Sequence, residues 1–95
     1  MKIIQSRFFE NKVKRFSKKQ KNVLDKQIHK ILDNPSIGQE KKGDLREVFV
    51  YKFKIETIQY LLSYRIAKNT LELIMIGPHE NYYRDLSSYL KKRKS

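Results

Sequence analysis

A lone histidine stands among aromatic and charged residues near the C-terminus, in the stretch IGPHENYYRDL at residues 76–86. His79 suits proton transfer, because an imidazole with an ordinary pKa of about 6.5 can hold or release a proton near neutral pH. A histidine at such a position can equally cap a helix or bond to the backbone. The sequence therefore offers His79 as a general acid or base and leaves a purely structural role open. His29 lies between two lysines in a helical stretch and is expected to be solvated.

Two stretches in which apolar and polar residues alternate carry positively charged side chains that can bind phosphate. Arg65 stands near the end of one stretch, and its planar guanidinium can grip two phosphate oxygens. An ion pair with Glu72 or Glu56 is the alternative for Arg65. Lys52 and Lys54 share one strand face about 6.6–7 Å apart, close to the spacing of neighbouring phosphates. The two lysines are expected to position a substrate. One of them could also act as a base if its neighbours depressed its pKa. The alternative is that both belong to an ordinary solvated strand edge.

The tyrosines after His79 supply further contacts. Tyr83 can stack on a base or donate its phenol to phosphate. Two phases of a closing helix fit the apolar pattern, and one of them buries Tyr82 whereas the other buries Tyr83. We choose Tyr83 as the exposed residue for its spacing from His79. Arg84 either contacts phosphate or pairs with Asp85 in a weak surface ion pair.

The charge balance of the chain is strongly basic. It has 22 Lys and Arg against 10 Asp and Glu, which gives a net charge of +12. Folding brings this self-repelling charge together, so a polyanionic partner is expected. Nucleic acid comes first, because each neutralised phosphate releases counterions, and an acidic protein is the other candidate. A lysine-rich solubilising surface is the alternative. The loop residues expected to contact a phosphate backbone are Lys41, Lys42 and Arg46.

Length and composition exclude several classes of protein. With 95 residues the chain has room for a single domain with one core. It has no apolar run of the roughly 20 residues needed to span a bilayer, and its start lacks the pattern of a signal peptide. The absence of cysteine excludes disulfides and zinc-thiolate sites. We therefore expect a cytoplasmic protein that uses no membrane, no metal and no cofactor.

Hydrophobic spacing predicts a short strand at residues 2–5 and then two amphipathic helices. The two helical stripes are Phe9, Val13 and Phe16, and then Leu24, Ile28, Ile31 and Leu32. Ser17 and Gln20 fit a capping box, so the second helix begins there. Asn34-Pro35 ends it, because proline disfavours the α conformation in the residue before it. The result is a helical hairpin that is apolar on one side.

Residues 34–44 hold two of the three glycines and are expected to form a loop. After this loop the spacing of the apolar residues changes from the 3.6-residue period of a helix to the 2-residue period of a strand. Three strands are predicted, at residues 47–55, 57–66 and 70–76, with a tight turn at Lys68-Asn69. Gly77-Pro78 is expected to break the last strand before a closing helix, and residues 91–95 to fray. The predicted fold class is α+β, with the helical hairpin packed on an antiparallel sheet and the helices on one side of it.

This layout resembles the RelE/ParE superfamily of bacterial type II toxins over nearly the whole chain. The segments that carry the resemblance are NPSIG, GDLREV, YKFK, YLLSYRI and GPHENYYRDL. The resemblance implies a microbial ribonuclease-like fold in a single toxin domain at residues 1–95 and a cognate acidic antitoxin. It usually implies cleavage of mRNA in the A site of the 70S ribosome, with operator DNA bound only through the antitoxin complex. The ParE branch is similar in fold but poisons DNA gyrase.

The segment GPHENYY favours the nuclease branch, because it is similar to YafQ and YoeB toxins. On that pattern His79 maps to the catalytic histidine and Tyr83 to the aromatic residue that follows it at this spacing. Lys52 and Lys54 match the lysine pair of RelE.

Two positions depart from the pattern. Leu61 stands where RelE has a strand arginine, and Gln59 falls where YafQ has an acidic residue. Arg65, on the same strand face as Leu61, is the expected substitute cation.

The implied reaction is attack of the ribose 2′ oxygen on the neighbouring phosphorus, without a metal. It needs a base, an acid and fixed positive charge at the phosphate. The residues expected to be catalytic are His79, Arg65, Tyr83 and Lys54, and those expected to bind substrate are Lys52, Arg46, Lys41, Lys42, Arg84 and Tyr82. The alternatives are a gyrase poison and a nontoxic module that only co-represses its operon with the antitoxin.

Overall fold

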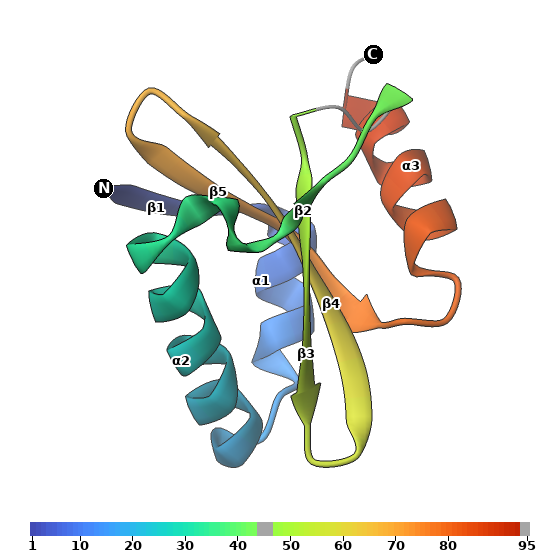
Figure 1. The fold of residues 1–95 in the computed structure, drawn as a ribbon. Coiled ribbons are helices and arrows are strands. Elements are labelled where there is room, and N and C mark those ends of the chain that lie inside the picture. The colour runs from blue at the N-terminus through green and yellow to red at the C-terminus, as the bar shows by residue number, and fades with distance from the viewer. Residues whose placement is uncertain (44–46, 94–95) are drawn as a thin grey trace.

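The protein folds around one mixed five-stranded sheet in the order β1-β5-β4-β3-β2 (Figure 1). The computed structural model describes residues 1–43 and 47–93. The elements are β1 (Lys2–Gln5), α1 (Arg7–Lys14), α2 (Lys18–Asp33), η1 (Pro35–Ile37), β2 (Gln39–Glu40), β3 (Phe49–Ile55), β4 (Ile58–Ala67), β5 (Thr70–Pro78) and α3 (Tyr82–Arg93). β3, β4 and β5 form the expected antiparallel meander, whereas β1 runs parallel to β5.

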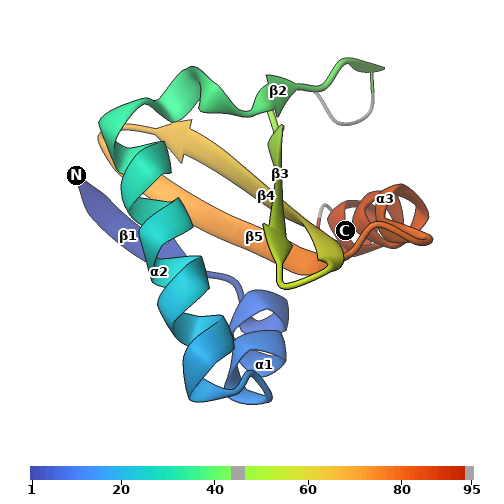
Figure 2. The same ribbon diagram turned by 60° about the horizontal axis from the view of Figure 1, so that its bottom comes forward.

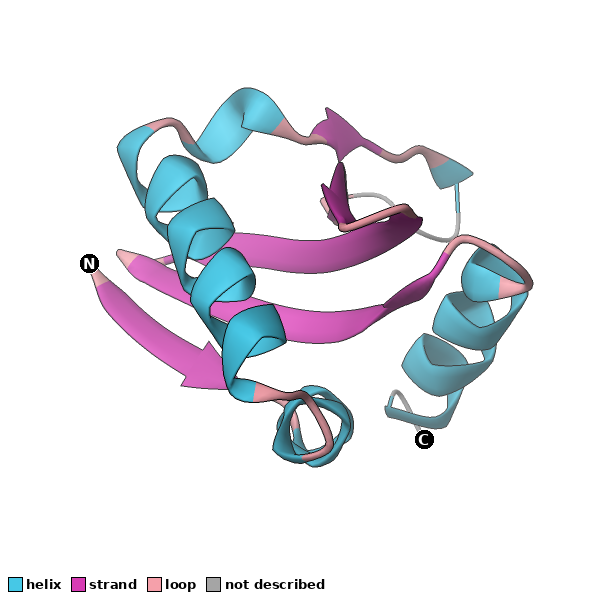
Figure 3. Ribbon diagram, turned by 90° about the horizontal axis from the view of Figure 1, so that it is seen from below, coloured by secondary structure: helices cyan, strands magenta, loops and turns pink. Residues whose placement is uncertain are grey.

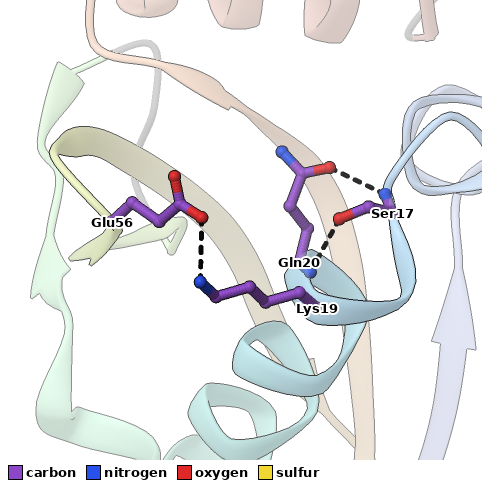
Figure 4. A network of polar contacts seen from close by, with 4 residues as sticks. All are labelled: Ser17, Lys19, Gln20 and Glu56. Atoms are coloured by element: carbon purple, nitrogen blue, oxygen red, sulfur yellow. Dashed lines mark hydrogen bonds and ion pairs between the residues drawn. The ribbon is translucent and has the colours of Figure 1, made fainter.

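Local hydrogen bonds explain where the first two helices begin. Ser6 caps α1, since its Oγ accepts from the Phe9 backbone N–H at 3.0 Å. Ser17 and Gln20 form the predicted capping box at the start of α2, with bonds of 3.1 and 2.7 Å (Figure 4). Both caps satisfy backbone donors that a helix leaves unpaired at its N-terminus. The start of α2 at Ser17 confirms the prediction, whereas the cap at Ser6 was not predicted.

The helical hairpin covers one face of the sheet. Leu24 and Ile31 of α2 are buried there, as is Phe9 of α1. The facing side chains of β3 are Phe49, Tyr51, Phe53 and Ile55, which confirms the strand face predicted from the alternation. An exposed ion pair of 3.1 Å joins Lys19 of α2 to Glu56 in the turn after β3 (Figure 4).

The closing helix α3 lies on the opposite face, which corrects the expectation that all helices share one side. Leu86 and Leu90 pack with Leu61 of β4 in a second buried cluster, while the next residue, Leu62, packs with the helical hairpin. Successive strand residues point to opposite faces, so both sides of the sheet are apolar at this strand. Figure 2 and Figure 3 show α2 and α3 on different sides of the sheet, whereas α1 also reaches α3, since the Phe8 and Tyr89 ring centroids lie 5.6 Å apart.

Several boundaries differ from the predicted ones. β5 continues through Gly77, which pairs with Leu61, and ends at Pro78, because proline has no N–H with which to extend the ladder. The predicted loop after α2 contains the short elements η1 and β2. The tail expected to fray is helical as far as Arg93. The predicted turn at Lys68-Asn69 is confirmed, with φ of 51° and 59°, as hairpin turns of this kind require.

Candidate active site

Tyr82 anchors α3 to the sheet. Its side chain is 2% exposed, and its hydroxyl donates to the Met75 carbonyl at 2.7 Å and lies 2.9 Å from Ser63 Oγ. Burial raises the pKa of Tyr82, and the hydrogen bonds with Ser63 partly counter that rise. The expectation that Tyr82 binds substrate is therefore wrong, because the side chain is enclosed in the core. This orientation also turns the next residue, Tyr83, outward.

Tyr83 is the centre of a small cluster formed by three separate segments. The His79 ring meets the Tyr83 ring edge-on, with centroids 6.3 Å apart and an interplanar angle of 84°. Lys41 Nζ lies 4.8 Å from the centroid of the same ring, in a cation–π contact. His79 is exposed and Tyr83 half-buried. We refer to these three residues as the His79–Tyr83–Lys41 cluster.

The turn between β5 and α3 presents His79 to solvent. Its carbonyl accepts from the Tyr82 backbone N–H at 3.2 Å, which closes the turn. Asn81 has a φ of 59°, a left-handed conformation that asparagine tolerates better than most residues. Pro78, Asn81 and the buried Tyr82 thus hold His79 at the start of α3.

The segment that carries Lys41 is tied to the core by Tyr64. The Tyr64 hydroxyl donates to the Pro35 carbonyl at 2.6 Å and accepts from the Gly38 N–H at 3.1 Å. Burial raises the pKa of Tyr64, and the bond from Gly38 opposes that rise. Lys41 then donates its own N–H to Val48 at 2.9 Å, so its backbone is held beside β3.

Lys52 and Lys54 lie at the same end of the sheet as His79. Both are exposed on the α3 face of β3, where Lys54 pairs with Gln59 of β4. Pro78 pairs with the neighbouring Tyr60, so His79 leaves the sheet beside this end. The backbones of β3 and β5 are two strand spacings apart, roughly 10 Å.

Arg65 is not brought together with these residues. It pairs in register with Glu72, four residues beyond Leu61 and therefore about 13 Å further along β4. Leu61 pairs with Lys52, and Ser63, which Tyr82 of α3 contacts, lies between that pair and Arg65 along β4. The register therefore separates Arg65 from His79 and the lysines, which argues against the expectation that Arg65 is the phosphate clamp of their site. Its Nε is buried without a hydrogen-bond partner among the described residues.

The departure at Leu61 has a structural reason. Leu61 is 0% exposed and belongs to the core beneath α3. An arginine there would place a charge under the helix at a large desolvation cost. Gln59, by contrast, is exposed next to Lys54.

The remaining predicted residues lie at the surface or outside the described ranges. Arg84 Nε lies 3.7 Å from Asp85 Oδ1, the ion pair foreseen as its alternative role. Lys42 is exposed, and His29 is exposed on α2 as expected. Arg46 falls outside the described residues. Within residues 1–43 and 47–93, no group of three or more His, Asp or Glu side chains is arranged to hold a metal.

Ser63 was missed by the sequence reasoning. It is fully buried, and its hydroxyl donates to the Met75 carbonyl at 3.3 Å while contacting Tyr82. The available signal was a single small polar residue inside the apolar run YLLSY, which needs a hydrogen-bond partner when it is buried.

Residues 3–87 match the family model of the ParE-like toxin of type II bacterial toxin-antitoxin systems. The chain therefore belongs to this toxin family. Its fold is similar to that of the E. coli RelE toxin crystallised alone, with a TM-score of 0.66 and 19% identity over 99% of this chain and 98% of that one. A chain of the intact E. coli RelBE toxin-antitoxin complex matches with a TM-score of 0.67 and 17% identity, over 83% of this chain and 96% of that one.

At these identities the likeness to the solved structures establishes the fold. No curated protein matches the sequence significantly. None of the helices that the structure describes is both long and apolar enough to cross a membrane.

Proposed function

We propose that this toxin is an endoribonuclease that cuts mRNA in the ribosomal A site. The observation that carries the proposal is the His79–Tyr83–Lys41 cluster, in which an imidazole, a phenol and an ammonium group converge at an open rim of the sheet. A titratable group beside an aromatic platform and fixed positive charge is the set that RNA cleavage requires. The net charge of +12 supports a polyanionic substrate.

In this proposal the chain acts on RNA through attack of the 2′ oxygen on the adjacent phosphorus. A base takes the 2′ proton, the bond to the 5′ oxygen breaks, and an acid protonates the departing oxygen. The products are a 2′,3′-cyclic phosphate and a 5′ hydroxyl, and the step involves no metal. His79 is the acid or the base, and Lys54 is the candidate for the second proton transfer.

The other residues of the site bind and orient RNA. Tyr83 stacks on a base or donates its phenol to the phosphate. Lys41 and Lys52, rather than the distant Arg65, supply positive charge to the phosphates beside His79. Lys42, near Lys41 in sequence, adds a contact without base preference.

The partner and the cellular context that we propose for this toxin are those of its family. An acidic antitoxin holds the toxin inactive in the cytoplasm, and operator DNA is met only through the complex of the two proteins. The cationic surface of the toxin is complementary to such a partner.

A gyrase poison is the second candidate, and a specific observation favours it. The position that aligns with the strand arginine of RelE is the buried Leu61, so the expected cation is absent from the substrate face at that point. The family model that matches is itself described as ParE-like. A nontoxic module that only binds antitoxin fits the same observation.

The test compares two exposed histidines of one chain. The toxin, its His79→Ala variant and its His29→Ala variant are each induced in cells, and new 5′ ends on transcripts are mapped. We expect new ends with the parent chain and with His29→Ala, and their loss with His79→Ala. DNA breaks with intact transcripts would instead support the gyrase poison, and cleavage that survives His79→Ala would remove the histidine from the mechanism.

A further inference from the structure

Lys41 is held more firmly than the other lysines assigned to the site. Its side chain is half-buried, whereas those of Lys52 and Lys54 are exposed. The Lys41 ammonium donates to Gln39 Oε1, with Nζ and the oxygen 3.2 Å apart, and Nζ lies 4.8 Å from the centroid of the Tyr83 ring. The ammonium of Lys41 therefore has a defined neighbour on each of two sides.

The pairing of β2 with β3 explains this orientation of Lys41. Gln39 lies opposite Val50, and the Lys41 N–H bonds to the Val48 carbonyl at 2.9 Å, which continues the ladder. Residues two apart on a strand point to the same face, so Gln39 and Lys41 lie together on the α3 side and Glu40 lies on the other. Figure 3 shows the segment that follows α2 passing β3 toward the start of α3.

The positive charge of Lys41 stays available to an anion. Its two neighbours are an amide oxygen and an aromatic ring, and both are neutral. Within residues 1–43 and 47–93, no carboxylate forms an ion pair with Lys41. An ammonium group has three N–H donors, and Gln39 takes one of them. Two donors therefore remain for the oxygens of a phosphate.

The two strand positions expected to supply a fixed cation do not supply one to His79. Leu61 is buried beneath α3, and Arg65 lies about 13 Å further along β4. Lys41 and His79, by contrast, contact the same Tyr83 ring. A phosphate bound at this ring is thus within reach of both groups. Charge that is already in position stabilises a transition state well, because nothing has to reorganise as the reaction proceeds.

We propose that Lys41 is a catalytic residue, whose ammonium stabilises the negative charge that builds up on the phosphate in the transition state, and that Gln39 is its positioning residue. This inference rests on the proposed function. The 2′ oxygen bonds to phosphorus, the bond to the 5′ oxygen breaks, and the two free N–H groups of Lys41 bond to the nonbridging oxygens meanwhile. Lys41 transfers no proton, a task that stays with His79 and Lys54. The sequence alone gave Lys41 only a contact to the RNA backbone.

The kinetic test separates catalysis from binding. Cleavage of mRNA on purified ribosomes is measured in single turnovers over a range of toxin concentrations in excess. Lys41→Met keeps the length of the side chain and removes its charge, so the maximal rate should fall by roughly 10²-fold or more. The toxin concentration for half-maximal rate should change far less, because the charge acts chiefly in the transition state. Lys26→Met, at an exposed position of α2, removes the same charge elsewhere and should keep the parent rate.

Two substitutions of the exposed Gln39 separate the position of the ammonium from its charge. Methylene protons above an aromatic ring resonate upfield in NMR, so the Lys41 Cε protons report whether the side chain lies over Tyr83. Gln39→Ala removes the acceptor, and both the upfield shift and the maximal rate should fall, the rate by roughly tenfold or more. Gln39→Glu keeps an acceptor oxygen but neutralises the ammonium, so the shift should remain while the rate falls.

The outcomes are distinguishable from a failure of the proposed function. If the parent chain leaves the mRNA intact, the proposed function fails and this inference fails with it. If the parent chain cleaves, a Lys41→Met variant with the parent maximal rate overturns the inference alone. Equal losses in Lys41→Met and Lys26→Met would do the same, as would a Gln39→Ala variant with the parent shift and rate. Thermal unfolding followed by circular dichroism confirms that each variant is folded.

Discussion

Replacing Tyr82 by phenylalanine removes the hydroxyl that joins α3 to the sheet and leaves the ring in place. The parent hydroxyl bonds to the Met75 carbonyl at 2.7 Å and to Ser63 Oγ at 2.9 Å. Ser63 retains its own bond to the same carbonyl at 3.3 Å, so Met75 keeps a donor in the variant. The substitution therefore removes the hydrogen bonds of the Tyr82 hydroxyl, while the buried Met75 carbonyl still accepts a hydrogen bond from Ser63.

The expected loss of stability at pH 7 follows from these contacts. A typical intramolecular hydrogen bond contributes a net 0.5–1.5 kcal/mol, so the free energy of unfolding should fall by about 1 kcal/mol. For a domain of this size that corresponds to a decrease in Tm of about 4–8 °C. Tyr83→Phe is the matched control, because its half-buried ring lies at the rim of the site, and its effect should stay within about 0.5 kcal/mol.

The same substitution should change the response to alkaline pH. Burial raises the pKa of Tyr82, so the folded state keeps the phenol proton after the unfolded chain begins to lose it at about pH 10. The stabilisation is complete below that pH and is lost as the pH rises toward the folded pKa. Tyr64 titrates in the same direction but is present in both proteins. The difference in stability between parent and Tyr82→Phe should therefore shrink above about pH 10.

Urea unfolding followed by circular dichroism, at pH 7 and at intervals from about pH 9 to 11, measures both effects. A variant as stable as the parent at pH 7, with the same slope above pH 10, would refute the assignment of Tyr82 as the anchor of α3. If Tyr82→Phe and Tyr83→Phe lowered the free energy of unfolding equally, the assignment of Tyr82 to the buried side of α3 and Tyr83 to its outer side would be refuted.

Three further predictions concern the site, the loop and the surface. His79→Ala should lower transcript cleavage by roughly 10²- to 10⁴-fold while the purified variant still binds antitoxin, as gel filtration of the complex would show. Gly38→Ala should destabilise the fold by about 1–3 kcal/mol in urea unfolding, because an added Cβ would lie 2.9 Å from the Tyr64 hydroxyl; an unchanged midpoint would contradict that packing. Lys19→Ala should change the free energy of unfolding by no more than about 0.5 kcal/mol, since its ion pair with Glu56 is exposed, and a double-mutant cycle with Glu56→Ala checks this.

Local signals in the sequence determined most of the secondary structure. The capping box at Ser17, the change of period after the loop and the left-handed turn at Lys68-Asn69 all depend on residues close together in the chain. The apolar and basic positions of β3 follow from simple alternation. The residues of the candidate site were also identifiable by type, since proton transfer and phosphate binding need histidine, tyrosine and lysine.

Only the tertiary structure decided how these parts combine. Leu61 and Leu62 make both faces of β4 apolar, so the sequence pattern does not assign α3 to a face. The choice between Tyr82 and Tyr83 depends on a hydrogen bond to Ser63, and the exclusion of Arg65 from the site depends on strand register. Each of these is a contact between segments distant in sequence, and periodicity describes only the direction in which a side chain points. What that side chain meets is determined when helices and strands pack together.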